Sequence, residues 1–116
     1  MTRKKWFSSR IRLVCSIANK GPIDFWDSIY VFKASSFKDG FKRALNIGKS
    51  QEEEYLNKEG EEVHWELFEI LTIDQIHGDE LDGAEVYFES VKVGKGNKIR
   101  FLNGFKPALS KPVQTI

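Results

Sequence analysis

The fold is decided by residues 6–17, which read WFSSRIRLVCSI. Apolar and polar residues alternate along this stretch, with Arg10 and Arg12 on the polar side. The other side would hold Phe7, Ser9, Ile11, Leu13, Cys15 and Ile17. A period of two is the pattern of a β-strand with one buried and one solvated face. The stretch therefore predicts a strand of an antiparallel sheet.

The next segments predict a hairpin partner and a covering helix. A turn at residues 19–22 leads to residues 26–34, which are aromatic and β-branched as strands are. Ser36 is a predicted N-cap, with Asp39 three residues later, and the helix should end near Lys49. Its apolar stripe would comprise Phe37, Phe41, Ala44, Leu45 and Gly48.

Further strands are expected at residues 53–57, 62–74, 85–93 and 98–102. The order ββαββββ predicts an α+β fold: a mostly antiparallel sheet of five to six strands with one helix packed on one face. Residues 1–103 would form this single domain, including a hairpin at 85–102, and residues 104–116 a loose tail.

Two face assignments follow from the alternation. In residues 62–74 one face would be apolar and would hold Val63, Trp65, Leu67, Leu71 and Ile73. Glu69 would interrupt this face, and Ile70 would lie on the opposite one. The sheet face away from the helix is either polar or covered by a partner. The polar alternative would use Arg10, Arg12, Ser28 and Glu66.

Charge is segregated along the chain although the net charge is only +1. Residues 1–51 carry 11 basic and 3 acidic residues, residues 52–91 carry 1 and 14, and residues 92–116 carry 6 and none. Such asymmetry concerns partners and electrostatic steering rather than fold. Because Cys15 is the one cysteine, no internal disulfide can form, and no apolar signal or membrane-length stretch is evident. We expect a cytoplasmic protein that does not contact the membrane.

A set of short motifs spans roughly residues 6–91 and comprises Trp6-Phe7-x-x-Arg10, Ile29-Tyr30-x-Phe32-Lys33-Ala34, Ile47-Gly48 and Asn57-x-x-Gly60-Glu61-x-Val63-x-Trp65. Through this pattern the chain resembles a family of short bacterial proteins of unknown function. The resemblance implies a fold plan but no activity. Small bacterial proteins of this kind are often immunity proteins of toxin systems, so it also raises the expectation of that role.

Motifs that could carry chemistry are incomplete. His64-x-Glu66 lacks the Pro-Cys-x-x-Cys half of a deaminase site, and the acidic loop around His77 lacks calcium-loop spacing. The glycine-rich residues 94–98 lack P-loop spacing. Ser8, Ser9 and Cys15 lack a nucleophile-elbow context. We therefore expect no enzyme activity, no catalytic residue, no metal ion and no cofactor.

The acidic block favours a protein-binding function. A carboxylate-rich surface can occupy the phosphate-binding cleft of a basic toxin, such as a nuclease, with an aromatic residue as anchor. The predicted partner-binding residues are Glu52, Glu53, Glu54, Tyr55, Glu59, Glu61, Glu62, Trp65, Asp79, Glu80 and Asp82. The alternative is a nucleic-acid-binding module that uses the basic ends of the chain. Its predicted cations are Arg3, Lys4, Lys5, Arg10, Arg12, Lys92, Lys95, Lys98, Arg100, Lys106 and Lys111, with Phe7 and Phe101 between them.

Overall fold

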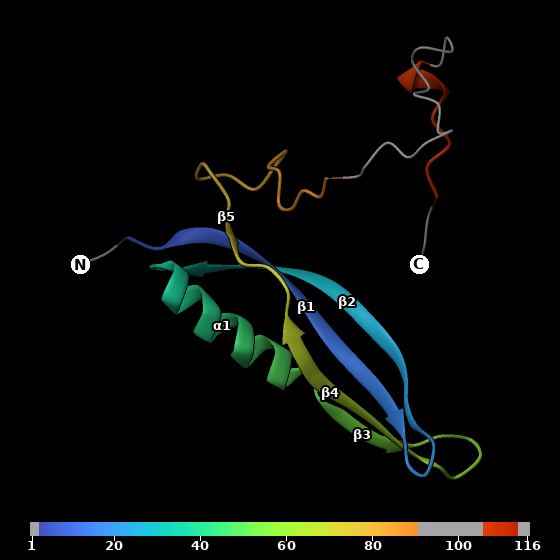
Figure 1. Cartoon of the computed structure of the whole chain (residues 1–116). Helices are drawn as coiled ribbons and strands as arrows, with labels where there is room; N and C mark the ends of the chain where they lie inside the picture. Colours follow the sequence, from blue (N-terminus) through green and yellow to red (C-terminus); the bar gives the residue numbers. More distant parts are fainter. Residues whose placement is uncertain (1–2, 91–105, 114–116) are drawn as a thin grey trace.

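A computed structural model describes residues 3–90 and 106–113 of the chain. Figure 1 shows a long, curled antiparallel sheet with a helix along one side. The elements in chain order are β1 (Lys5–Ile17), β2 (Gly21–Ala34), α1 (Phe37–Ser50), β3 (Glu53–Leu56), β4 (Glu62–Ile70), β5 (Asp74–Gln75) and a 3-10 turn (Pro107–Leu109). The strand order is β2-β1-β4-β3, and β5 also pairs with β1. The predicted α+β class, with a helix on an antiparallel sheet of about five strands, is confirmed.

The β1–β2 hairpin is longer than the sequence predicts. Its register runs from Lys5 opposite Ala34 to Ile17 opposite Gly21, so β2 begins five residues before the predicted start. The turn is short because Asn19 adopts the left-handed conformation (φ 73°), which asparagine tolerates better than most residues. The chain therefore reverses within three residues, and pairing resumes at once.

The predicted strand 62–74 is one interrupted strand along β1. β4 pairs with the second half of β1, and β5 pairs with its beginning. Between them Leu71 donates its N–H to the carbonyl of Arg10 (2.8 Å), and the Thr72 hydroxyl accepts a hydrogen bond from the Arg10 N–H (3.0 Å). These two bonds keep the segment against β1 where regular pairing is lost.

A bulge in β4 overturns one predicted face assignment. Arg12 lies opposite Glu69 and Leu13 opposite Leu67, which leaves Phe68 as an extra residue. An extra residue shifts the alternation by one position. Consequently Ile70 packs toward the core, where the simple alternation had placed Glu69.

The core lies between the sheet and α1. Its buried members are Phe7, Ile11, Phe32, Ala34 and Ala44, with Tyr30, Ile47, Leu67, Ile70 and Ile73 packed against them. We call the sheet face under α1 the helix side and the opposite face the open face. The predicted inward side of β1 is confirmed for Phe7, Ser9, Ile11 and Cys15, but Ser8 on the opposite side is buried as well. Ser28, predicted on the polar face, lies opposite Ile11 and therefore on the helix side.

The helix packs through small residues rather than through its phenylalanines. Gly40, Ala44 and Gly48 are its buried positions, whereas Phe37 and Phe41 are 66% and 43% exposed. The prediction that these two phenylalanines cover the sheet is wrong. Because these buried residues have small side chains, the helix axis can approach the sheet closely. The two phenylalanine side chains then lie outside the helix–sheet interface and are exposed.

The predicted N-cap is confirmed. The Ser36 hydroxyl accepts a hydrogen bond from the Asp39 N–H (3.1 Å), and α1 begins at the next residue. The Asp39 carboxylate accepts one from the Ser35 N–H (2.8 Å), and this bond lowers the pKa of Asp39. Such reciprocal bonds satisfy donors that a helix start leaves unpaired. None of the helices in the described ranges is long and apolar enough to cross a membrane.

The predicted hairpin at 85–102 does not form in its described part. Residues 84–90 adopt no strand, and residues 91–102 lie outside the described residues. Tyr87 instead packs on the open face, where its hydroxyl accepts a hydrogen bond from Arg10 (3.1 Å). The Arg10 guanidinium carbon lies 5.6 Å from the centre of the Tyr87 ring, a cation–π distance. This segment therefore meets the sheet through side chains.

Candidate functional site

The β3–β4 hairpin carries most of the acidic residues predicted to bind a partner, and a tight turn fixes its shape. The Asn57 side-chain oxygen accepts hydrogen bonds from the N–H groups of Glu59 (3.0 Å) and Glu61 (2.9 Å). Gly60 adopts the left-handed conformation (φ 78°), which is free of steric cost for glycine. The hairpin therefore has one register, and each of its side chains has a defined face.

The hairpin glutamates are divided between the two faces. Glu53 lies opposite Trp65 on the helix side, and Glu54 lies opposite His64 on the open face. Glu62 is two residues from His64 and so shares the open face with it. The carboxylates thus surround the edge of the sheet rather than covering one face.

Three further glutamates lie at the ends of the hairpin. Glu52 accepts a hydrogen bond from the Leu67 N–H (3.0 Å), and Glu59 is exposed in the turn. Glu61 forms an ion pair with Lys20 (2.9 Å), and the hydrogen bond from Lys20 lowers its pKa. Of the six predicted glutamates, five are exposed and only Glu61 is half-buried.

The predicted loop acids, Asp79, Glu80 and Asp82, lie at the other end of the sheet. They follow β5, which pairs with Phe7 and Ser8 near the start of β1, whereas the hairpin meets β1 near Ile17 (Figure 1). Nine residues of strand correspond to about 30 Å. Asp79 also forms an ion pair with Arg3 (2.6 Å). The acidic block of the sequence therefore forms two separate groups and not one surface.

An aromatic group lies next to the hairpin glutamates, just beyond the end of α1. The rings of Trp26 and Trp65 meet edge to face with centroids 4.9 Å apart. The Trp65 indole N–H donates to the Tyr55 hydroxyl (3.3 Å). We call these three residues the aromatic platform. Trp26 is 57% exposed and Tyr55 43% exposed.

The platform borders a shallow hollow of about 470 Å³ on the helix side. Leu13 and Tyr30 line it, while Gln51 and Glu53 stand at its edge near the helix end. Tyr55 and Trp65 are among the predicted partner-binding residues, whereas Trp26 is not. The pattern that could have identified Trp26 is the alternation along β2, which places Trp26 on the same face as Tyr30.

One group of side chains in the described residues has the composition of a cation site. Ligand atoms of Glu54, Glu62 and His64 all lie within 4.8 Å of one another, and His64 Nε2 is 3.8 Å from Glu54 Oε1. The sequence pairs His64 with Glu66 along one strand. The structure instead places Glu54 directly opposite it on the neighbouring strand.

On the open face, Asp27 joins two arginines of β1. Its carboxylate receives two hydrogen bonds from Arg12 (2.7 and 2.8 Å) and pairs with Arg10 (3.0 Å). These contacts, that with Arg12 first, lower the pKa of Asp27. Arg10 and Arg12 were predicted to contact nucleic-acid phosphates. In the structure they form an ion-pair network with Asp27, and Arg10 also donates to the Tyr87 hydroxyl.

This network predicts an acid-dependent stability. A carboxylate whose folded pKa lies below its unfolded value of about 3.9 stabilises the fold above that pH. The contribution is lost as the pH falls through the folded pKa. We therefore expect Asp27→Asn to be less stable than wild type near neutral pH, and the difference to shrink by at least roughly half near pH 2.

Urea unfolding at the two pH values measures this difference. Asp24→Asn is the matched control, because Asp24 lies on the same strand and its carboxylate accepts a hydrogen bond from the Phe25 N–H rather than from an arginine. A pH-independent difference for Asp27→Asn would show that the ion pairs contribute nothing to folding.

The remaining chemically reactive side chains lie in the sheet. Cys15 is buried, and burial raises the pKa of its thiol. The Ser9 hydroxyl donates to the Thr72 carbonyl (2.7 Å), and the buried Ser8 hydroxyl has no hydrogen-bond partner among the described residues. Of the predicted basic C-terminal residues, Lys106 and Lys111 are exposed. Lys92, Lys95, Lys98, Arg100 and Phe101 lie outside the described residues.

Comparison with known proteins places the chain in a family. Residues 6–88, which span α1, β2 to β5 and all of β1 except its first residue, match the model of a domain of unknown function, DUF4288. The chain belongs to the DUF4288 family. The resemblance inferred from the sequence is thereby confirmed at the level of a family of unknown function. No curated protein and no solved structure matches this DUF4288 chain.

Proposed function

We propose that this DUF4288 protein binds a basic protein partner through the β3–β4 hairpin and the aromatic platform. The finer form of the proposal is an immunity-type inhibitor of a basic toxin effector, such as a nuclease. The observation that carries it is that exposed glutamates lie beside the aromatic platform, beyond the end of α1.

The charge of the hairpin supports a cationic partner. Residues 52–66 contain seven glutamates and one lysine, and most of these carboxylates are exposed. Like charges held close together repel one another and strengthen the field that steers an oppositely charged partner. Since the glutamates surround the sheet edge on both faces, a concave basic cleft could enclose the hairpin.

The platform supports a specific contact rather than steering alone. Tryptophan and tyrosine dominate the residues that contribute most to protein–protein affinity. Trp26 and Trp65 support each other's rings, and the Trp65–Tyr55 hydrogen bond further orients the group. Rings held in place in the free protein lose little entropy on binding.

A nuclease is the partner class that fits this surface best. Its cleft carries cations that bind phosphates. Carboxylates spaced along a hairpin edge can take the place of those phosphates, and the platform can insert beside them. This surface would block the cleft without any catalytic group of its own.

Site-specific photo-cross-linking in cells that encode the protein tests the location. A photoreactive residue at Leu56, opposite Glu62 among the hairpin glutamates, is expected to capture a basic protein. The control is Phe37 at the start of α1, because both side chains are 66% exposed. The captured protein is then purified for kinetics.

Charge reversal tests the mechanism. Glu53→Lys with Glu54→Lys is expected to slow association about tenfold at low salt and to flatten its salt dependence. Glu80→Lys with Asp82→Lys changes the charge equally but at the distant end. There the rate measured at about 0.1 M salt should stay within about twofold, since the Debye length is then roughly 10 Å. Equal slowing by both pairs, or capture from both photoreactive positions, would contradict the proposed surface.

A further inference from the structure

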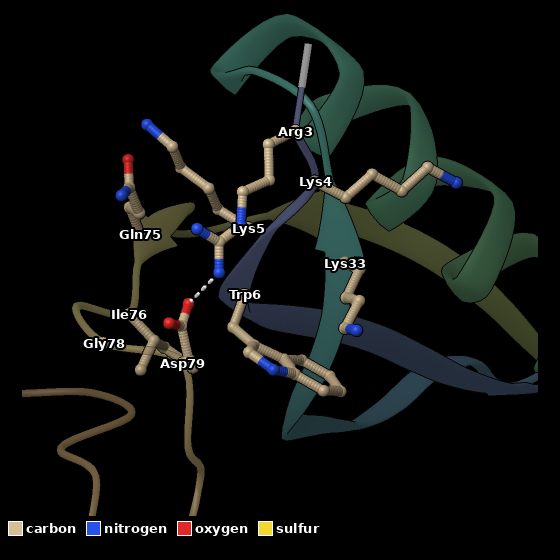
Figure 2. Close-up of a pocket in the computed structure, with 9 residues that line it drawn as sticks. All are labelled: Arg3, Lys4, Lys5, Trp6, Lys33, Gln75, Ile76, Gly78 and Asp79. Atoms are coloured by element: carbon tan, nitrogen blue, oxygen red, sulfur yellow. Dashed lines mark hydrogen bonds and ion pairs between the residues drawn. The ribbon is translucent and has the colours of Figure 1, made fainter. Parts of the chain in front are cut away.

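A cationic hollow lies at the end of the sheet opposite the hairpin. It has a volume of about 280 Å³ and lies between the start of β1, the end of β2 and the segment after β5. Figure 2 shows the side chains that line it, among them Arg3, Lys4, Lys5, Trp6 and Lys33. The Ile76 N–H donates to the Trp6 carbonyl (2.8 Å). That bond joins the wall after β5 to β1.

Positive charge dominates this hollow. Four cationic side chains line it, and Asp79 is the one carboxylate among the described residues that do so. Asp79 faces Arg3 in Figure 2 and binds it at 2.6 Å. Both side chains are largely exposed, at 79% and 74%. An exposed ion pair of this kind contributes little to stability, so an incoming anion can replace Asp79 at Arg3 at small cost.

An aromatic ring stands in the wall beside the cations. Trp6 is half-buried, and the Lys33 ammonium lies 5.1 Å from the centre of its ring. Arg3, which precedes β1, extends toward Asp79, and Lys33 of β2 extends toward Trp6, whereas the ammonium groups of Lys4 and Lys5 point away from the indole (Figure 2). Cations thus lie on both sides of an indole that is accessible from the hollow.

We propose that this hollow binds single-stranded nucleic acid. One base would pack on Trp6, and the phosphates on either side of it would pair with Arg3 and Lys33. Aromatic rings combined with a cationic groove are the general means by which proteins bind single strands without sequence preference. A duplex keeps its bases stacked and cannot offer one to a ring in a hollow of this size. The acidic hairpin, about 30 Å away, repels the negatively charged strand, so the nucleic acid would stay at this end of the sheet.

Two of the participants, Lys33 and Trp6, do not belong to the predicted basic footprint. Arg10 and Arg12, which do belong to it, form ion pairs with Asp27. The β1–β2 register brings Lys33 directly opposite Trp6. This site is separate from the proposed protein-binding surface, so either can fail without the other.

Binding is measured by fluorescence anisotropy at low salt with the whole protein. The probes are labelled DNA and RNA single strands of about ten nucleotides, a length in the range that one small domain covers. A duplex of the same sequence, polyglutamate of equal charge and inorganic phosphate are the competitors. We expect micromolar binding of both single strands and much weaker competition by the other three.

Variants locate the contact. Trp6→Leu should weaken binding about tenfold, whereas Trp6→Phe, which keeps a ring, should retain it. Lys33→Ala should reduce the slope of log K against log salt by about 0.7, the loss of one phosphate contact. Asp79→Asn should tighten binding, because it frees Arg3. Lys58→Ala, in the hairpin turn, is the control and should change nothing.

Four results would overturn the proposal. One is the absence of saturable binding up to about 100 μM, the weak limit for non-specific association. Equal affinity for the duplex would exclude base stacking, and equal competition by polyglutamate would show a general site for acidic proteins. Wild-type affinity of a folded Trp6→Leu variant would place any binding elsewhere on the molecule.

Discussion

Gly48→Ala is expected to lower the free energy of unfolding by about 1–3 kcal/mol, the usual cost of overpacking a core. An added methyl group at this position would lie 2.6 Å from Leu67 Cδ1 and 3.3 Å from Ile11 Cγ2. Leu67 packs between α1 and the sheet, so it can move away only by opening a gap on the helix side. The helix would then lose its close contact with β1 and β4. Chemical denaturation of the purified variant measures the change.

Gly40→Ala in the same helix is the matched comparison. There the added methyl group would meet Ile73 Cγ2 at 3.5 Å and Phe7 at 3.6 Å, which are ordinary contacts. Alanine is favoured over glycine in a helix interior by roughly 0.5–1 kcal/mol. We therefore expect Gly40→Ala to be more stable than wild type. Equal effects at the two positions would mean that helix propensity outweighs the close packing at Gly48.

Trp65→Ala is expected to weaken binding of the basic partner by about 2–4 kcal/mol, or at least roughly 30-fold in Kd. The substitution removes the central ring of the platform and leaves both Trp26 and Tyr55 without their contact to it. Most of the change should appear in the dissociation rate, since steering by the glutamates is unchanged. Surface plasmon resonance with the captured partner measures both rates.

Two further variants separate the platform from general effects on β4. Phe68→Ala removes an aromatic side chain of the same strand that is 56% exposed and contacts Phe25 on the open face. It should leave affinity within about twofold. Trp65→Phe keeps a ring but loses the bond to Tyr55, and it should fall between wild type and Trp65→Ala. A Phe68→Ala effect as large as that of Trp65→Ala would place the interface on the open face.

The fold was largely predictable because its central strand is regular. Alternation over residues 6–17 gave the inward side of β1, and Ser36 gave the helix start. The alternation failed after Phe68, because one unpaired residue reverses the faces and leaves no mark in the sequence pattern. It also failed for Phe37 and Phe41. Apolar periodicity does not distinguish a helix that packs through large apolar side chains from one that packs through glycine and alanine.

The candidate site was predictable only in part. The clustering of glutamates in and beside the β3–β4 hairpin follows from their closeness in sequence, but their division between the two faces depends on the strand register. Asp79 and its neighbours were separated from them because the chain continues along β1 to β5. Trp26 and Trp65 come together only because β1 pairs with both β2 and β4. In this pairing Leu13 of β1 lies between Trp26 of β2 and Leu67 of β4. Contacts of this kind depend on tertiary pairing, which local patterns do not encode.

The position of β3 at the margin of the sheet affects how the protein can diverge. In the described part of the chain, β3 pairs with β4 alone, and all four of its residues are exposed. Substitutions there change the shape and charge of the proposed surface while leaving the packing under α1 intact. A family with this architecture can acquire new partners through mutations in one short strand, with the rest of the domain kept as a constant scaffold.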